Sequence, residues 1–129
     1  MRRAEGWRRI LESTVRDRQA DFVVDIEGEL EGIVSVGPCR DDDANGAGEV
    51  YGIYLSSNLW GYGIGIKLMA VALETLVSYG FDEARLWVFE ANERARRFYE
   101  VGGWLADGGT KVELFDGFPI TEVRYRREL

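Results

Sequence analysis

Three glycines that alternate with other residues, Gly61, Gly63 and Gly65, constrain the fold of this chain more than any other feature. They stand between a strand-like run at 49–55 and an apolar run with helical periodicity at 66–79. Glycine has no Cβ, so successive backbone N–H groups in such a loop can approach a ligand closely. At the start of a helix, these N–H groups and the positive end of the helix dipole favour a phosphate or pyrophosphate. The glycines alone fit a phosphate-binding loop and a ligand-free turn equally well.

Two other phosphate-binding loops do not fit this stretch. A Walker A loop has glycine before its lysine and Ser or Thr after it, whereas Lys67 lies between Ile66 and Leu68. A dinucleotide-binding fingerprint that begins at Gly61 would need its third glycine at residue 66, which is isoleucine. One that begins at Gly63 would need it at residue 68, which is leucine. The sequence therefore excludes both loops.

Length and composition indicate one globular domain over residues 1–129. Apolar residues make up 46% of the chain and charged residues 30%, as in soluble globular proteins. No apolar run approaches the roughly 20 residues of a membrane span, and no apolar segment of a secretory signal follows Met1. A single cysteine, Cys39, excludes an intrachain disulfide framework. We therefore expect a cytoplasmic protein.

The net charge of −7 is distributed unevenly along the chain. Residues 1–20 carry six arginines and three acids, whereas residues 21–60 carry nine acids and one basic residue, Arg40. An acidic face disfavours nucleic acid and would attract a cationic acceptor such as an amine, but on charge alone an ordinary solvated surface is the better explanation. The absence of histidine excludes a histidine-based catalytic triad and a histidine metal site.

Residues 40–48 form an acidic, turn-rich stretch. Four of its residues match the first half of an EF-hand calcium loop: Asp41, Asp43, Asn45 and Gly46. The bidentate glutamate that such a loop needs is replaced by Gly52, and the flanking segments read as strands. We therefore expect a solvated hairpin loop and no metal.

Hydrophobic periodicity predicts nine elements in the order α-β-β-β-α-β-α-β-β. The first is an amphipathic helix whose apolar residues fall near one face: Trp7, Ile10, Leu11 and Val15. Alternation predicts a β-hairpin with strands at 22–26 and 30–36, ended by Pro38. The later elements are a strand, a helix, a strand, a helix and a closing strand pair, at residues 49–55, 66–79, 84–89, 93–101, 111–115 and 120–127.

Local signals support the later boundaries. Gly80 fits the position after a helix C-terminus, Asn92 fits a helix N-cap, and Gly102 fits a helix stop. The stretch Asp116-Gly117 fits the turn of the closing hairpin. Together the elements predict a single α/β (α+β) domain with a mostly antiparallel mixed sheet flanked by helices.

Two stretches resemble the signatures of the GNAT family of N-acetyltransferases. Residues 60–65, Trp-Gly-Tyr-Gly-Ile-Gly, resemble the family's acetyl-CoA loop, Gln/Arg-x-x-Gly-x-Gly/Ala, with Trp60 in place of Gln or Arg. Residues 92–104 resemble its second signature, Asn-x-x-Ala-x-x-Phe-Tyr-x-x-x-Gly-Phe/Trp. The two stretches occur in the family's order and on the expected elements, and the resemblance covers roughly residues 7–129.

The resemblance implies that acetyl-CoA lies where the strand at 49–55 diverges from the strand at 84–89. Backbone groups near Tyr54 and Leu55 would pair with the pantetheine arm, and N–H groups of residues 61–65 would hold the pyrophosphate. Asn92 would hydrogen-bond the pantetheine, act as an N-cap, or do both. The cofactor-binding residues implied in this way are Tyr54, Leu55, Trp60, Gly61, Tyr62, Gly63, Ile64, Gly65, Asn92 and Arg97.

The implied reaction transfers acetyl from acetyl-CoA to a primary amine of a small molecule or peptide, by direct attack in a ternary complex. An alkylammonium with a pKa near ~10.4 must lose a proton before it attacks, and the departing thiolate must gain one. Tyr99 matches the family tyrosine near the sulfur, a candidate general acid, and also fits a core aromatic residue. Glu49 lies eleven residues before Trp60, which resembles the spacing of the catalytic glutamate in histone-modifying members. Glu49 is therefore a candidate base. Alternatively, Glu49 is an ordinary surface acid at the sheet edge and water acts as the base.

A catalytically silent acyl-CoA-binding or regulatory domain is the alternative function, and an unrelated phosphate-binding module is a third. Family members usually begin with a strand and a helix, whereas the first element here resembles their second helix. We therefore expect an N-terminally short domain, either a natural short form or a fragment. The missing strand would leave an open sheet edge at 21–26, which predicts a homodimer. The expected partners are acetyl-CoA and an amine acceptor, without nucleic acid or membrane.

Overall fold

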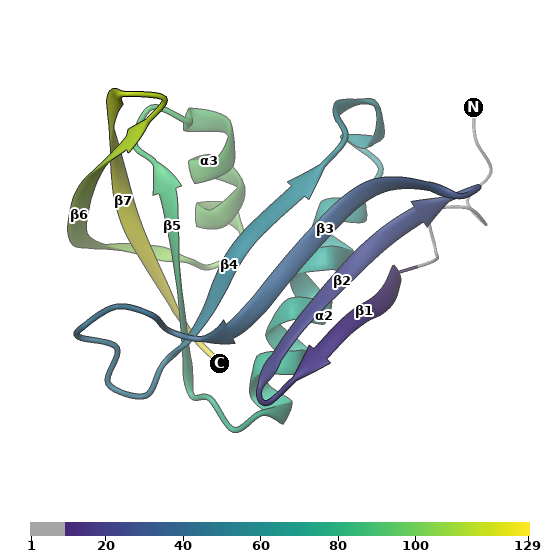
Figure 1. Cartoon of the computed structure of the whole chain (residues 1–129), viewed down its shortest axis with the longest axis horizontal. Coiled ribbons are helices and arrows are strands. Elements are labelled where there is room, and N and C mark those ends of the chain that lie inside the picture. Colours follow the sequence, from purple (N-terminus) through teal and green to yellow (C-terminus); the bar gives the residue numbers. More distant parts are fainter. Residues whose placement is uncertain (1–9) are drawn as a thin grey trace.

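The computed structural model describes residues 10–129, which form a seven-stranded sheet with helices packed on one face (Figure 1). The strand order is β1-β2-β3-β4-β5-β7-β6, and every neighbouring pair is antiparallel except β4 with β5. In chain order the elements are β1 (Ile10–Arg16), β2 (Gln19–Ile26), β3 (Glu29–Pro38), β4 (Gly48–Leu55), the short 3-10 helix η1 (Ser57–Leu59), α2 (Ile64–Ser78), β5 (Glu83–Phe89), α3 (Glu93–Val101), β6 (Leu105–Phe115) and β7 (Phe118–Glu128). The predicted α/β class with a mostly antiparallel mixed sheet is confirmed.

The opening segment is a strand, and the predicted helix there is wrong. β1 pairs antiparallel with β2, beginning with Ile10 opposite Val24. The segment contains three β-branched residues, which suit an extended chain: Ile10, Thr14 and Val15. Trp7, which the predicted helix included, lies outside the described residues. The observed order of elements is therefore β-β-β-β-α-β-α-β-β.

The pairing of β1 with β2 also changes the sheet edge. The sequence predicts an open edge at 21–26, whereas β1 lies beside this segment and supplies hydrogen-bonding partners for it. The open edge was the reason for expecting a homodimer, so this reason no longer holds. Among residues 10–129, the outermost strand on this side of the sheet is β1.

Two hairpins turn where the sequence predicts turns. Between β2 and β3, Glu27 and Gly28 both have positive φ, at 53° and 86°. Between β6 and β7, Asp116 and Gly117 have φ of 52° and 83°. Two consecutive left-handed residues give the turn whose twist matches that of the flanking strands. These turns fix the register of both hairpins.

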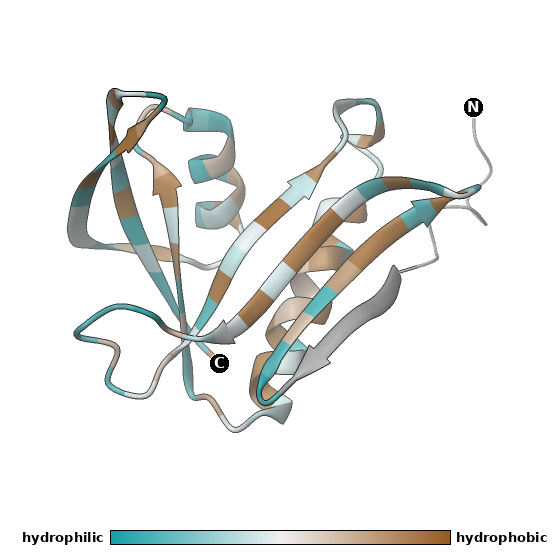
Figure 2. Cartoon of the chain, viewed as in Figure 1, coloured by the Kyte–Doolittle hydropathy of each residue, from teal (hydrophilic) through white to brown (hydrophobic). Residues whose placement is uncertain are grey.

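One hydrophobic core lies between the helices and one face of the sheet. In α2 the predicted apolar row is fully buried: Ile64, Leu68, Ala72 and Leu76. Hydrophobic and hydrophilic residues alternate along β2, β3 and β4, so each strand buries one side (Figure 2). The helix ends as predicted, because Gly80 adopts a φ of 94° and its N–H donates to the Val77 carbonyl at 2.9 Å.

The opposite side of the sheet carries none of the described helices, and we call it the helix-free face. It bears Glu49, Arg85, Trp87 and Arg124, because their strand neighbours point into the core. The segment 39–47, which joins β3 to β4, crosses part of this face and hydrogen-bonds to it. Within residues 10–129, no helix combines the length and apolarity needed to span a membrane.

Candidate active site

The parallel strands β4 and β5 pair only at their beginnings. Gly48 lies opposite Ala84 and Glu49 opposite Arg85, and no later residues of the two strands are paired. β4 continues beside β3 while β5 continues beside β7, so the two strands diverge (Figure 1). The segment 50–55 therefore has no strand partner on its β5 side, and an extended ligand can pair with such a backbone. Tyr54 and Leu55, two predicted ligand-binding residues, lie at the end of this segment.

The glycine loop follows directly at the start of α2. Gly61 and Gly63 adopt φ of 91° and 79°, and a Cβ on either would meet no atom within 4 Å. Gly63 is the N-cap of α2 and supplies no side-chain cap, and the first turn contains no acidic residue. The first N–H groups of α2 therefore remain available to an anion, and open space surrounds the loop that presents them. The residues present fit a phosphate group.

Trp60 and Asn92 have defined structural roles beside this loop. The Trp60 indole N–H donates to the Leu55 carbonyl at 3.0 Å, and its ring lies against Arg94 of α3. The Asn92 side chain accepts a hydrogen bond from the Ala95 N–H at 3.1 Å, which confirms the predicted N-cap. A ligand-binding role for Asn92 stays a prediction, as does that of the exposed Arg97.

Tyr99 is a buried residue of α3, with 8% of its surface exposed. Its ring makes edge-to-face contacts with Phe98 and Trp104, with centroid distances of 5.6 and 6.3 Å. Burial raises the pKa of Tyr99 to about 12. The hydroxyl therefore stays protonated at neutral pH, which is the state that a proton donor requires.

Glu49 is buried, in contrast to the exposed edge acid that was one of its two interpretations. Only 2% of it is exposed, and its carboxylate accepts hydrogen bonds from the backbone N–H and the Nη2 of Arg40, both at 2.9 Å. The hydrogen bond to Glu49 raises the pKa of the Arg40 guanidinium. Glu49 lies at the last paired position before β4 leaves β5, so it holds segment 39–47 at the base of the divergence.

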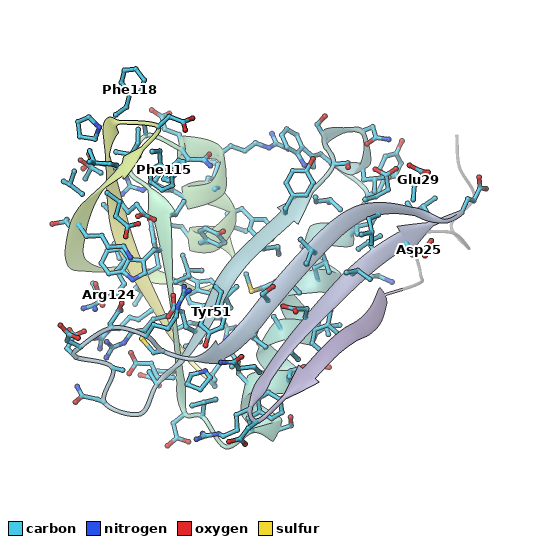
Figure 3. All side chains as sticks on the ribbon, in the orientation of Figure 1. Asp25, Glu29, Tyr51, Phe115, Phe118 and Arg124 are labelled. Atoms are coloured by element: carbon cyan, nitrogen blue, oxygen red, sulfur yellow. The ribbon has the colours of Figure 1, made fainter. Side chains whose placement is uncertain are left out.

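The acidic segment 39–47 is bound to the helix-free face and is not simply solvated. Arg124 of β7 donates to Asp41 at 3.1 Å and to Asp43 at 2.9 Å, and the Trp87 indole N–H donates to Asp41 at 3.0 Å. The buried Arg85 donates to the Asp43 carbonyl at 2.8 Å. The carboxylates that resemble calcium ligands in the sequence are therefore paired with arginine side chains. Arg124 is labelled in Figure 3.

Three residues beside the predicted ones were missed by the sequence analysis. Arg94 is at a variable position of the second signature and Arg40 begins the acidic stretch, so no pattern indicated a role, and their partners became visible only in the folded chain. Glu122 of β7 is a buried carboxylate, and nothing in the strand pattern distinguishes it from exposed acids. Alternation along β7 does place Glu122 on the face of the sheet opposite to that of the buried Val123. The residues that bury Glu122, however, come from other strands.

Comparison with known proteins identifies relatives of the chain. The sequence matches the model of the acetyltransferase (GNAT) family over residues 2–103. An uncharacterised N-acetyltransferase of Archaeoglobus fulgidus is 36% identical over 89 residues, covering 65% of this chain and 58% of the relative. The uncharacterised N-acetyltransferase YuaI of Bacillus subtilis is 37% identical over 68 residues, covering 53% and 39%. The chain thus spans about half the length of these curated relatives.

Solved acetyltransferase structures share the fold. The ribosomal-protein-alanine N-acetyltransferase from Brucella melitensis superposes with a TM-score of 0.74 at 22% identity, covering 88% of this chain and 71% of that one. Nourseothricin acetyltransferase gives a TM-score of 0.73 at 24% identity, with coverages of 86% and 65%. At such identities the likeness concerns the fold alone.

Proposed function

The chain belongs to the acetyltransferase (GNAT) family, and from this premise we propose that it transfers acetyl from acetyl-CoA to a primary amine. One observation carries the proposal: β4 and β5 diverge directly beside a glycine loop at an uncapped helix start. This arrangement offers an unpaired strand edge for an extended arm and N–H groups for a pyrophosphate. Both parts of one elongated, anionic ligand are thereby accommodated.

We assign the binding of acetyl-CoA to backbone groups along this path. Residues near Tyr54 and Leu55 would pair with the pantetheine arm, and the loop from Trp60 to Gly65 would hold the pyrophosphate. When bound, acetyl-CoA supplies an acyl thioester that is already activated toward an amine. The residues of the chain then need to orient the amine, accept its proton and protonate the leaving sulfur.

Tyr99 is our candidate proton donor to the sulfur, because burial keeps its hydroxyl protonated. Glu49 is our candidate acceptor of the amine proton, either directly or through water. Arg40, however, already donates hydrogen bonds to both oxygens of this carboxylate. Water alone therefore remains the alternative proton acceptor.

A catalytically silent acyl-CoA-binding domain is the second candidate function. Two observations favour it: Glu49 is occupied by Arg40, and Trp60 replaces the side chain that is usual at its position. Release of free thiol from acetyl-CoA with a panel of primary amines distinguishes the two functions. Thiol release supports the enzyme, whereas thermal stabilisation by acetyl-CoA without thiol release supports the silent domain. If acetyl-CoA causes neither thiol release nor thermal stabilisation, both candidate functions are contradicted.

A homodimer and a cytoplasmic location stay predictions. Among residues 10–129 the sheet has two outer strands, β1 and β6, and either edge could pair with a second copy. Light scattering at micromolar concentration measures the oligomeric state, and a monomer would refute the dimer.

A further inference from the structure

A buried carboxylate with one unpaired oxygen lies on the helix-free face. Glu122 is 8% exposed, and its Oε2 is buried without a hydrogen-bond partner among residues 10–129. Leaving a buried polar group unpaired costs about 1–3 kcal/mol, and more if the group is charged. Native proteins keep few such groups, and the binding of a ligand or ion is one explanation for those they keep. Glu122 therefore needs a reason that the fold alone does not provide.

The register of the sheet identifies the neighbours of Glu122. It lies opposite Phe89 of β5 on one side and opposite Lys111 of β6 on the other. Directly paired residues of an antiparallel sheet point to the same face. The next residue of β7, Val123, is part of the core, so these three side chains lie on the helix-free face.

Aromatic side chains flank this carboxylate. The rings of Phe89 and Phe115 meet edge to face at 5.2 Å, although they come from β5 and β6, which lie on opposite sides of β7. Both remain partly exposed, at 40% and 43%, and Phe118 at the tip of the hairpin is 69% exposed. Figure 3 shows Phe115 and Phe118 together at this end of the β6–β7 hairpin. An apolar surface thus adjoins the buried charge.

The charges around Glu122 favour a cation. Burial and a hydrogen bond with the neighbouring carboxyl of Glu113 raise the pKa of Glu122, while the charge of Lys111 opposes this shift. The ammonium of Lys111 lies over the Trp87 ring, 4.3 Å from its centre, and forms no ion pair with Glu122 in the described part of the chain. Two carboxyls beside one lysine that is engaged elsewhere leave the site attractive to a positive charge.

The same surface adjoins the proposed reaction site. Phe89 ends β5, the strand from which β4 diverges, and α2 and α3 pack on the other face. We therefore expect an acceptor to approach, from the helix-free face where Phe89 lies, the point where β4 and β5 separate. Resting on the proposed function, we propose that the acceptor is a cationic amine with an aromatic or aliphatic body. Glu122 binds its positive charge, and the rings of Phe89 and Phe115 contact its body.

The test compares two probes of matched shape and different charge, 2-phenylethylamine and 2-phenylethanol. Their binding to the 129-residue protein is measured by saturation-transfer NMR and calorimetry, with and without acetyl-CoA. We expect the amine to bind at least about tenfold more tightly than the alcohol, the usual scale for a charge-assisted contact. Equal affinities, or no binding of the amine, would overturn the proposal.

Glu122→Gln keeps the shape of the side chain and removes its charge. We expect this variant to lose the preference for the amine while melting at the same or a higher temperature, because an unpaired buried charge is removed. The matched control is Glu74→Gln, an exposed carboxylate of α2 on the other side of the sheet. An unchanged amine preference in Glu122→Gln, or the same loss in Glu74→Gln, would contradict the assignment.

The outcome separates this inference from the proposed function. If acetyl-CoA is consumed with amines at rates that Glu122→Gln does not change, the acceptor assignment fails and the proposed function stands. If acetyl-CoA neither binds nor reacts, the proposed function fails. The amine and alcohol affinities still decide whether Glu122 binds a cation, because that measurement does not require turnover.

Discussion

Arg94 places its guanidinium carbon 3.9 Å from the centre of the Trp60 ring, and this contact connects the first turn of α3 with the glycine loop. Trp60 is itself fixed, because its indole N–H donates to the Leu55 carbonyl. Position 60 therefore supplies no charge of its own, but it holds a cation beside the loop proposed to bind pyrophosphate. We therefore expect Arg94, a residue from another element, to compensate for the departure from the family pattern at position 60.

Replacing Arg94 by glutamine is expected to weaken acetyl-CoA binding. An exposed cation–π contact contributes about 0.5–1 kcal/mol. If this contact holds Arg94 in place for acetyl-CoA, its loss corresponds to a roughly two- to fivefold lower affinity for acetyl-CoA. Trp60→Ala should have a similar effect, whereas Trp60→Phe keeps a ring for Arg94 and should lose less. Calorimetric titration with acetyl-CoA measures the change. Arg126→Gln, on β7, is the control, and an equal loss there would indicate a general charge effect.

Gly63→Val is expected to abolish acetyl-CoA binding while the protein stays folded. The φ of 79° imposes a strain of about 1–2 kcal/mol on any residue with a Cβ. The added side chain would occupy the open space next to the loop. Gly46→Val is a matched control, because Gly46 also has a φ of 79° and open surroundings but lies in the segment 39–47. Similar melting temperatures with equal acetyl-CoA affinities would refute the role of the loop.

Tyr99→Phe is expected to lower kcat with little change in the KM for acetyl-CoA. The ring contacts with Phe98 and Trp104 are retained, while the proton donor is lost. A general acid typically contributes a factor of about 10²–10⁴ to the rate. Steady-state kinetics with an accepted amine provides the measurement, and an undiminished kcat would leave Tyr99 as a core residue.

Glu49→Gln and Arg40→Gln distinguish two roles of the same ion pair. Each variant breaks the pair and should destabilise the protein by about 1–3 kcal/mol, the scale of hydrogen bonds to charged groups. If Glu49 is the base, only Glu49→Gln should flatten the rising limb of the pH–rate profile. Identical profiles in the two variants and the parent would assign the proton to water and leave Glu49 a structural role.

The cluster around Arg124 predicts how stability depends on pH. Hydrogen bonds from Arg124 lower the pKa of Asp43; for Asp107, burial opposes the shift, but hydrogen bonds from Gly109 and Arg124 outweigh it and the pKa is lowered. Carboxyls whose pKa is lower in the folded state stabilise it above their unfolded pKa of about 3.9. This contribution should be lost as the pH falls through the lower folded values.

Melting temperatures measured from pH 7 downward test this expectation. Arg124→Gln should have a lower melting temperature than the parent at pH 7. Its melting temperature should also fall less on acidification, because the carboxyls of Asp43 and Asp107 no longer have Arg124 as a partner. Arg18→Gln is the control, since Arg18 lies over the Phe81 ring and outside this cluster. Parallel curves for the parent and Arg124→Gln would show that other groups control the acid sensitivity.

The sequence by itself determined the elements that local chemistry specifies. Gly80 follows α2, Asn92 caps α3, and Asp116-Gly117 turns the last hairpin, each at the predicted place, whereas α2 begins at Ile64, two residues before the predicted start. These features depend on φ preferences and on hydrogen bonds between residues close in sequence. The alternation of apolar residues likewise sufficed for the strand faces, and the two signatures sufficed for the family.

The tertiary structure decided what depends on distant partners. The apolar residues of segment 10–16 have spacings that fit either a helix or a strand. The segment forms a strand because it pairs with the edge of β2, which would otherwise be exposed. Arg40 pairs with the buried Glu49, the Trp60 ring contacts Arg94, and one oxygen of the buried Glu122 is left without a partner. Whether a charged side chain is solvated, paired or isolated depends on which segments surround it. That depends on long-range packing, and no local pattern of residues encodes it.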